Sequence, residues 1–193
     1  MHMLFIKKRH VYLHVMYFSV SILSMKKLLT LFTSGMLLIT VAKAQYVNIP
    51  DSGLRVMLKG FYPGCFNAND EMDTTCIAIV TEDSLNLGLF SNNSQPIDSL
   101  DGVQYFKSLL AFDCRNCTDV KTLPKLAPTI KRLYCNAMWS LLYLPTLPPT
   151  LEILDVAGCG RLRSLPPLPA TLKWFYGGYY NQLDSLPDFP NGL

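Results

Sequence analysis

The most constraining feature of the sequence is a dipeptide that recurs at a fixed interval. Leu-Pro occurs at residues 123–124, 144–145, 165–166 and 186–187. A constant period of about 21 residues is typical of solenoid proteins, in which one short unit of structure is repeated and stacked. Each copy is followed by a second and then a third apolar residue at constant offsets: Leu126 and Ile130, Leu147 and Leu151, Leu168 and Leu172, Phe189 and Leu193.

The residues between these copies predict how one repeat unit, or rung, folds. Leu133 and Cys135 lie two positions apart, which places both on the inner face of a short strand, with Arg132, Tyr134 and Asn136 on the outer face. The prolines that follow cannot donate to a sheet, and they favour an extended, polyproline-like return arm over a helix. One rung cannot bury its apolar edge alone, so we expect rungs to stack at about 4.8 Å into a parallel sheet that lines a concave face.

The full repeat reads L-x-x-L-x-C-x-x-C-x-x-L-x-x-L-P-x-L-P-x-x-L. This pattern resembles the leucine-rich repeat, in particular the short L-P-x-L-P-x-x-L form of secreted bacterial proteins. The resemblance covers residues 85–193 and implies a leucine-rich repeat solenoid of strands and extended return arms. The first rung is expected to be slightly longer than the others, with a strand at Leu85, Leu87 and Leu89 and a return arm through Ile97, Leu100, Val103 and Phe106.

The N-terminus indicates export. Residues 25–44 combine a basic start, an apolar stretch and the small-x-small sequence Ala42-Lys43-Ala44, which together are typical of a secretory signal peptide. Residues 1–24 are then interpreted as an upstream extension from a misassigned start. The alternative is a membrane hairpin of two segments, but the apolar run from Leu28 is shorter than the roughly 20 residues that a span requires. We therefore expect a secreted or cell-surface protein with no membrane span in its mature chain.

Removal of this leader changes the chemistry of the chain. Residues 45–193 hold 11 basic and 14 acidic residues, a net charge of −3, and no histidine. An acidic chain without a basic cluster argues against nucleic-acid binding, which requires several cationic contacts to phosphate. The absence of histidine from this part excludes a Ser-His-Asp triad, a Cys-His dyad and a His-ligated zinc. No P-loop, G-x-G-x-x-G, H-E-x-x-H or G-x-S-x-G motif occurs either, so we predict a protein that is not an enzyme and uses no cofactor.

Residues 45–84 are predicted to cap the open end of the solenoid, because an uncapped first rung would expose apolar side chains and a strand edge. A helix is expected over residues 53–61, begun by Asp51-Ser52 and ended by Pro63-Gly64. Cys65 and Cys76 lie in this segment outside the repeat, and in an exported protein they are the candidates for a disulfide. The stretch 47–51 with the helix after it resembles the N-terminal cap of secreted bacterial repeat proteins.

The other four cysteines occupy core positions of the repeat, where Val156, Gly177, Met138 and Tyr180 replace them in other rungs. We therefore expect Cys114, Cys117, Cys135 and Cys159 to be buried free thiols. The alternative for Cys114-Arg115-Asn116-Cys117 is a redox pair or half a zinc site, but no second C-x-x-C completes four ligands.

A second candidate for metal binding is the acidic loop before Cys76. Asn67, Asn69, Glu71 and Asp73 resemble the first half of a calcium loop, yet the Gly and Glu of an EF-hand are missing, which favours a solvated loop. No metal site is predicted.

The binding surface is predicted on the outer face of the strands, where aromatic residues and arginine lie beside aspartate as they do in interface cores. The alternative is that these exposed positions vary freely and carry no site, and a further one is that the rings are platforms for sugars, with Asp113 and Asp155 accepting from hydroxyl groups. The candidate residues are Asp113, Arg115, Arg132, Tyr134, Asn136, Asp155, Trp174, Tyr176 and Tyr179.

Three functions are considered for this sequence. The first is a secreted, non-enzymatic recognition or adhesion module that binds a protein or a carbohydrate. The second is suggested by the resemblance to injected bacterial effectors, in which such repeats serve as the substrate-recognition arm of a ubiquitin ligase. A cytosolic plant immune receptor is a third interpretation, for which no nucleotide-binding motif is present. The chain stops in mid-repeat at residues 191–193, which predicts that further rungs follow in a longer protein.

Overall fold

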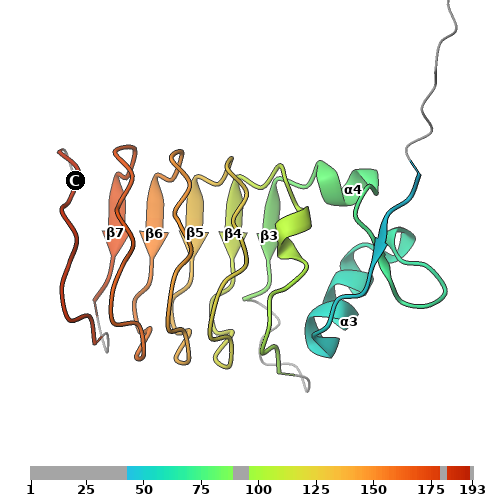
Figure 1. The fold of residues 1–193 in the computed structure, drawn as a ribbon, viewed down its shortest axis with the longest axis horizontal. Coiled ribbons are helices and arrows are strands. Elements are labelled where there is room, and N and C mark those ends of the chain that lie inside the picture. Colours follow the sequence, from blue (N-terminus) through green and yellow to red (C-terminus); the bar gives the residue numbers. More distant parts are fainter. Residues whose placement is uncertain (1–42, 89–95, 179–181, 192–193) are drawn as a thin grey trace, which may run out of the picture. The chain divides into compact units, whose positions relative to one another are not determined.

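A five-stranded parallel sheet organises the part of the chain that the structure describes. The structure is a computed structural model that describes residues 43–88, 96–178 and 182–191, and residues 43–193 form one compact unit. Strands β3 (Ser84–Asn86), β4 (Ala111–Asp113), β5 (Arg132–Tyr134), β6 (Ile153–Asp155) and β7 (Trp174–Tyr176) lie side by side in sequence order (Figure 1). The predicted parallel-strand solenoid is confirmed.

The register follows the sequence period. Leu133 pairs with Leu154, and Leu154 pairs with Phe175, so the residues predicted to share one inner column do share it. From β4 onward each strand pairs with the strand one sequence period later, whereas Ser84 pairs with Ala111, which makes the first rung longer. Strand β3 contains Leu85, and Leu87 follows it in the core, while Leu89 lies outside the described residues.

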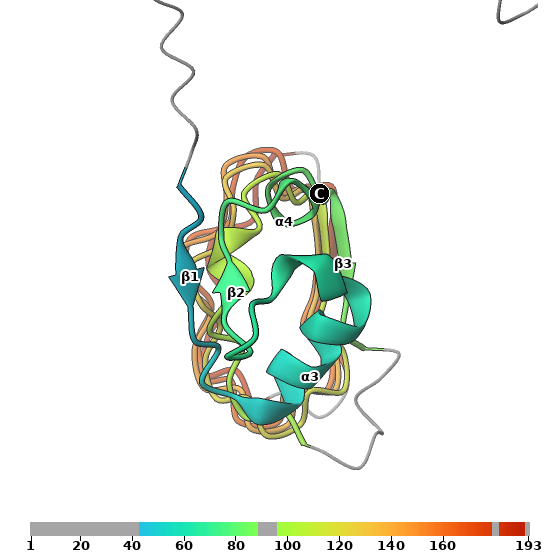
Figure 2. The same ribbon diagram turned by 90° about the vertical axis from the view of Figure 1, so that its right-hand side faces the viewer.

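The return arms are extended, as their prolines require. Residues 119–130, 140–151 and 161–172 contain neither helix nor strand, and a single bridge joins Thr122 to Tyr143 in neighbouring arms. Between the sheet and these arms lies one continuous apolar core, which includes Phe112, Leu133 and Leu154. Viewed end on, the sheet forms one wall and the arms form the opposite wall (Figure 2).

Threonine hydroxyl groups join each rung to the previous one just before the strands begin. Thr150 Oγ1 donates to Pro128 O at 2.7 Å and to Ile130 O at 2.9 Å. The equivalent groups are Thr129, bound to Lys107 O and Leu109 O, and Thr171, bound to Pro149 O and Leu151 O. Because backbone carbonyl groups need donors, these hydroxyl groups extend the bonding between rungs beyond the ends of the short strands.

The N-terminal segment carries the expected helix, α3 (Ser52–Phe61). It begins one residue earlier than the sequence pattern predicts, and Asp51 Oδ1 accepts from Leu54 N at 2.6 Å as the N-cap. The segment also contains β1 (Tyr46–Val47), η1 (Pro63–Cys65), β2 (Met72–Asp73) and α4 (Ile77–Val80), with β1 antiparallel to β2. The expected disulfide between Cys65 and Cys76 is present.

Hydrogen bonds and ring contacts tie this segment to the first rung. Asp51 Oδ2 accepts from Asp98 N at 2.9 Å and from Ser99 N at 3.2 Å. Burial opposes ionisation of this carboxyl group, but its three backbone hydrogen bonds lower its pKa all the same. The ring of Tyr62 lies 5.6 Å from that of Phe106, which belongs to the first return arm. The segment and the repeats therefore share one core.

No helix in the described part of the chain is long and apolar enough to cross a membrane. The predicted leader, residues 1–44, lies almost wholly outside the described residues.

Candidate functional site

The outer face of the sheet presents two columns of side chains. One column runs along the first residue of each strand, where Arg132, Ile153 and Trp174 are paired in register. The other runs along the third residue, where Asp113, Tyr134, Asp155 and Tyr176 follow one another, so that acid and tyrosine alternate. The alternation of a strand places both columns away from the core.

Both outer-face residues of the last strand, β7, are exposed aromatic side chains. Trp174 is 59% exposed and Tyr176 is 52% exposed, although both are large rings that usually bury much of their area. Arg132 is also exposed, and Tyr134, Asp155, Arg115 and Asn136 are half-buried. Tyr179 lies outside the described residues.

Asp113 was expected to be an exposed hydrogen-bond acceptor for a ligand, but its side chain is only 11% exposed. Arg115 covers it: Nε lies 2.9 Å from Oδ1 and Nη2 lies 2.6 Å from Oδ2, a two-pronged ion pair. The guanidinium carbon of Arg115 also lies 5.7 Å from the centre of the Tyr134 ring, within the range of a cation–π contact. Asp113 is therefore committed to Arg115 and is not free to accept from a sugar hydroxyl, whereas Asp155 is the more accessible acid.

Asp155 lies between two tyrosines in the register of the sheet. Burial raises the pKa of this carboxyl group, although the backbone N–H of Ala157, 3.1 Å from Oδ1, and the charge of Arg115 act in the opposite direction. A carboxylate that is short of water and lies beside tyrosines is suited to a cationic group.

Asn136 Oδ1, in the rung next to Arg115, is buried with no hydrogen-bond partner among the described residues. Its burial gives a ligand no access to this oxygen.

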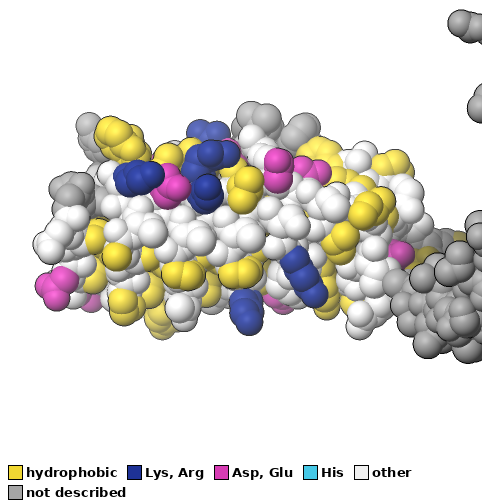
Figure 3. Space-filling view, turned by 90° about the horizontal axis from the view of Figure 1, so that it is seen from above, with side chains coloured by type: hydrophobic (Ala, Val, Ile, Leu, Met, Phe, Trp, Pro, Cys, Tyr) yellow, Lys and Arg dark blue, Asp and Glu magenta, His cyan; other side chains and the backbone are white. Residues whose placement is uncertain are grey.

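Charged residues gather at the edge where the strands begin. Lys173 Nζ lies 2.7 Å from Glu152 Oε2, and this hydrogen bond lowers the pKa of Glu152, with smaller contributions from the charges of Lys131 and Arg132. Figure 3 looks onto this edge and shows Lys and Arg side chains beside Asp and Glu. The mixture of signs leaves no purely basic patch here.

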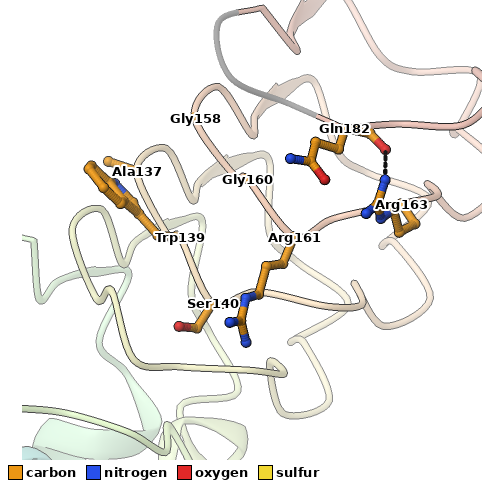
Figure 4. A pocket seen from close by; sticks show the side chains of 8 residues that line it. All are labelled: Ala137, Trp139, Ser140, Gly158, Gly160, Arg161, Arg163 and Gln182. Atoms are coloured by element: carbon orange, nitrogen blue, oxygen red, sulfur yellow. Dashed lines mark hydrogen bonds between the residues drawn. The ribbon is translucent and has the colours of Figure 1, made fainter.

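A groove on the opposite edge, after the ends of the strands, was not predicted from the sequence. It has a volume of about 1150 Å³, and its lining comes from three rungs (Figure 4). A pattern in the sequence does point to it, because Ser140, Arg161 and Gln182 occupy the same repeat position in successive rungs. The lining residues are Ala137, Trp139, Ser140, Gly158, Gly160, Arg161, Arg163 and Gln182.

The four cysteines of the repeat are buried free thiols, as predicted. Burial raises the pKa of Cys117 to about 12 and that of Cys159 to about 12. Cys114 Sγ lies 3.6 Å from Cys135 Sγ in the next rung, and burial raises the pKa of both thiols. Thiols held in the protonated form are poor nucleophiles, so these cysteines pack and do not react.

The residues that resembled a calcium loop form a turn of their own. Asn67 Oδ1 accepts from the backbone N–H groups of Asn69 and Glu71, at 2.9 and 3.0 Å. Within the described residues no cluster of three or more metal-ligating side chains occurs.

No protein-family model matches the sequence, and no curated protein matches it either.

Proposed function

We propose that the chain is an exported, non-enzymatic recognition module of the leucine-rich repeat type, and that it binds a protein through the outer face of strands β3–β7. The sequence repeat supports the family, since the Leu-Pro dipeptides at 123–124, 144–145, 165–166 and 186–187 keep the same 21-residue spacing as the paired strands β4–β7. Residues 45–84, with α3 and the Cys65–Cys76 disulfide, serve as its N-terminal cap.

The observation that carries the binding proposal is the exposure of Trp174 and Tyr176 on one strand, 59% and 52%. A tryptophan and a tyrosine bury large areas on binding and lose little side-chain entropy, which is why such residues dominate protein interfaces. Arg132 stands in the same column as Trp174, and arginine is the third residue type enriched in interface hot spots.

The charges on this face indicate the chemistry of the partner. Asp155 is flanked by Tyr134 and Tyr176, and a carboxylate between aromatic rings suits a lysine or arginine side chain. The mature chain has a net charge of −3, which favours encounter with a basic surface. The proposed partner therefore presents a basic and apolar patch.

The test is a comparison of two double variants with the same kind of change. Trp174→Ala/Tyr176→Ala removes the rings of the outer face, and Trp139→Ala/Tyr143→Ala removes two rings that are 67% and 63% exposed outside the sheet. Each immobilised protein is incubated with extracellular proteins from the organism of origin, and retained proteins are identified by mass spectrometry. We expect a protein that the wild type and the second variant retain and that the first variant loses. The same retained set for both variants would overturn the proposal.

Export is tested separately by the N-terminal mass of the protein that its own cells make. A mass that begins at Gln45, found outside the cytosol, supports an exported module. An intact leader on a cytosolic protein would instead favour the alternative, a recognition arm of a larger effector enzyme.

A further inference from the structure

The groove on the edge after the strands lies where a tryptophan in one rung is followed by a glycine in the next. Trp139 and Gly160 occupy the same repeat position in neighbouring rungs, so the glycine leaves uncovered the space that a second side chain would fill. Trp139 is 67% exposed. Gly158, which stands at the position of Ala137, lies on the same side and adds no side chain to the floor. Figure 4 shows the indole at one side of this open floor.

Polar groups line the other side of the groove. Arg161 is exposed, and it takes part in none of the salt bridges formed by residues 43–88, 96–178 and 182–191. Arg163 is held in place, because Nη1 donates to Gln182 O at 3.4 Å and lies 3.8 Å from Asp184 Oδ1. Ser140 and Gln182 occupy the same repeat position as Arg161, and they add a hydroxyl group and an amide beside the guanidinium group of Arg161.

These features select the chemistry of the occupant. The guanidinium group of Arg161 forms no salt bridge with a carboxylate of the described residues, so it can bind a carboxylate of a ligand through two parallel hydrogen bonds. An exposed indole beside a floor without side chains can stack on an apolar ring face, and the C–H face of a pyranose is such a surface. Hydroxyl and amide groups then have sugar hydroxyl groups as partners. The volume of about 1150 Å³ lies just above the range of about 300–1,000 Å³ for small-ligand sites, which leaves room for a short oligosaccharide.

We propose that this groove binds an acidic oligosaccharide built from uronic acid units, with Trp139 stacked on a sugar ring and Arg161 bound to its carboxylate. A uronic acid carries the apolar ring face and the carboxylate on one unit, which matches the indole and the guanidinium group of one groove. An acidic peptide that binds as an added strand needs a free sheet edge, and the groove lies beyond the ends of the strands. This site is separate from the outer face of the sheet proposed above to bind a protein.

The two tryptophans of the chain allow a direct measurement. In the full chain with Trp174→Phe, Trp139 is the only indole, and its fluorescence is titrated with tetragalacturonate. The matched probes are the methyl ester of the same tetramer, which keeps the rings and loses the charge, and tetraglutamate, which keeps the charge and loses the rings. We expect a saturable change with tetragalacturonate and roughly tenfold weaker binding of each matched probe, since a charge-assisted bond contributes about 1.5 kcal/mol or more.

Variants then assign the residues, with calorimetry used where the fluorophore is removed. Arg161→Ala and Trp139→Ala are expected to weaken binding of tetragalacturonate by roughly tenfold or more, while Lys125→Ala, which removes an exposed basic residue on the return arm 119–130, leaves it unchanged. All three positions are exposed, so unchanged thermal unfolding serves as the check on folding. No saturable binding of tetragalacturonate, equal loss in all three variants, or preference for tetraglutamate would each overturn the proposal. Protein capture by the outer face is unaffected by any of these outcomes.

Discussion

At the scale of single residues, the ion pair of Asp113 and Arg115 is the strongest polar feature of the outer face. We expect Asp113→Asn to lower the free energy of unfolding by about 1–2 kcal/mol, because a buried carboxylate loses its two-pronged bond while Arg115, 43% exposed, is partly rescued by water. Urea unfolding measures this change. Glu152→Gln alters the pair with Lys173, where both groups reach solvent, and should leave stability unchanged. Equal effects at the two positions would contradict the difference in burial.

The buried thiols make stability depend on pH in the alkaline range. The pKa of Cys159 is about 12 in the folded chain against 9.0 for an ordinary thiol, so near pH 10 the folded state keeps a proton that the unfolded state has lost. Since the folded state then binds more protons, the free energy of unfolding falls as pH rises above 9, by about 1.4 kcal/mol per pH unit for this thiol.

Cys159→Ser isolates this effect. Serine does not ionise in this range, and its hydroxyl group still donates to Cys135 O, which Cys159 Sγ reaches at 3.1 Å. Urea unfolding between pH 8 and pH 11 should show a shallower loss of stability in the variant than in the wild type, whatever its stability at pH 8. Parallel curves would mean that the thiol is not held in its neutral form.

At the scale of structural elements, the turn after each strand repeats one unusual backbone conformation. Asn116, Ala137 and Gly158 stand at the same position in successive rungs, and their φ angles are 60°, 59° and 73°. In this left-handed region an alanine costs about 1–2 kcal/mol, whereas glycine adopts it freely.

We therefore expect Ala137→Gly to raise the free energy of unfolding by about 0.5–1 kcal/mol, after subtraction of the greater freedom of glycine in the unfolded chain. Gly158→Ala is the reverse change at the equivalent position. Its added carbon would lie 3.4 Å from Ala137 N, so space is available and the backbone conformation decides the result. Thermal unfolding of the two variants should shift in opposite directions, and a shift in the same direction would be evidence against a shared turn.

The threonines at the start of the strands join neighbouring rungs through side chains. Thr150→Val keeps the branched shape and removes the hydroxyl group, which leaves Pro128 O and Ile130 O without this donor. We expect a loss of about 1 kcal/mol in the free energy of unfolding by chemical denaturation, and recovery of most of it in Thr150→Ser, which restores the donor. A serine variant as unstable as the valine variant would assign the effect to packing instead.

At the scale of the whole molecule, the period of the sequence was sufficient to predict the stack. A side chain that recurs at the same place in every repeat meets its own equivalents in the neighbouring rungs, so the inner column of Leu133, Leu154 and Phe175 follows from spacing alone. The helix of the N-terminal segment was predicted from its own apolar period and its cap residue Asp51.

The candidate sites were harder to predict because they depend on residues that differ from rung to rung. The exposure of Trp174 followed from strand alternation, but the burial of Asp113 depends on Arg115 folding back over it, a choice of side-chain conformation that spacing does not encode. The groove is lined by Trp139 and Gly160, which stand at a repeat position with no common residue type, so the repeat consensus carries no information about it.

A stack in which each strand pairs only with its neighbours should lose stability locally when one rung is damaged. Leu154 is fully buried in the fourth of five strands, and Leu154→Ala should cost about 2–5 kcal/mol because the cavity lies between two packed rungs. In amide hydrogen exchange we expect the largest acceleration in β5, β6 and β7, with a smaller change in α3 at the other end of the sheet. Leu186→Ala is the matched control, since Leu186 is 55% exposed and leaves little cavity. Equal acceleration from α3 to β7 would instead show that residues 43–193 unfold as one cooperative unit, and the additive behaviour expected of a solenoid would not apply to this chain.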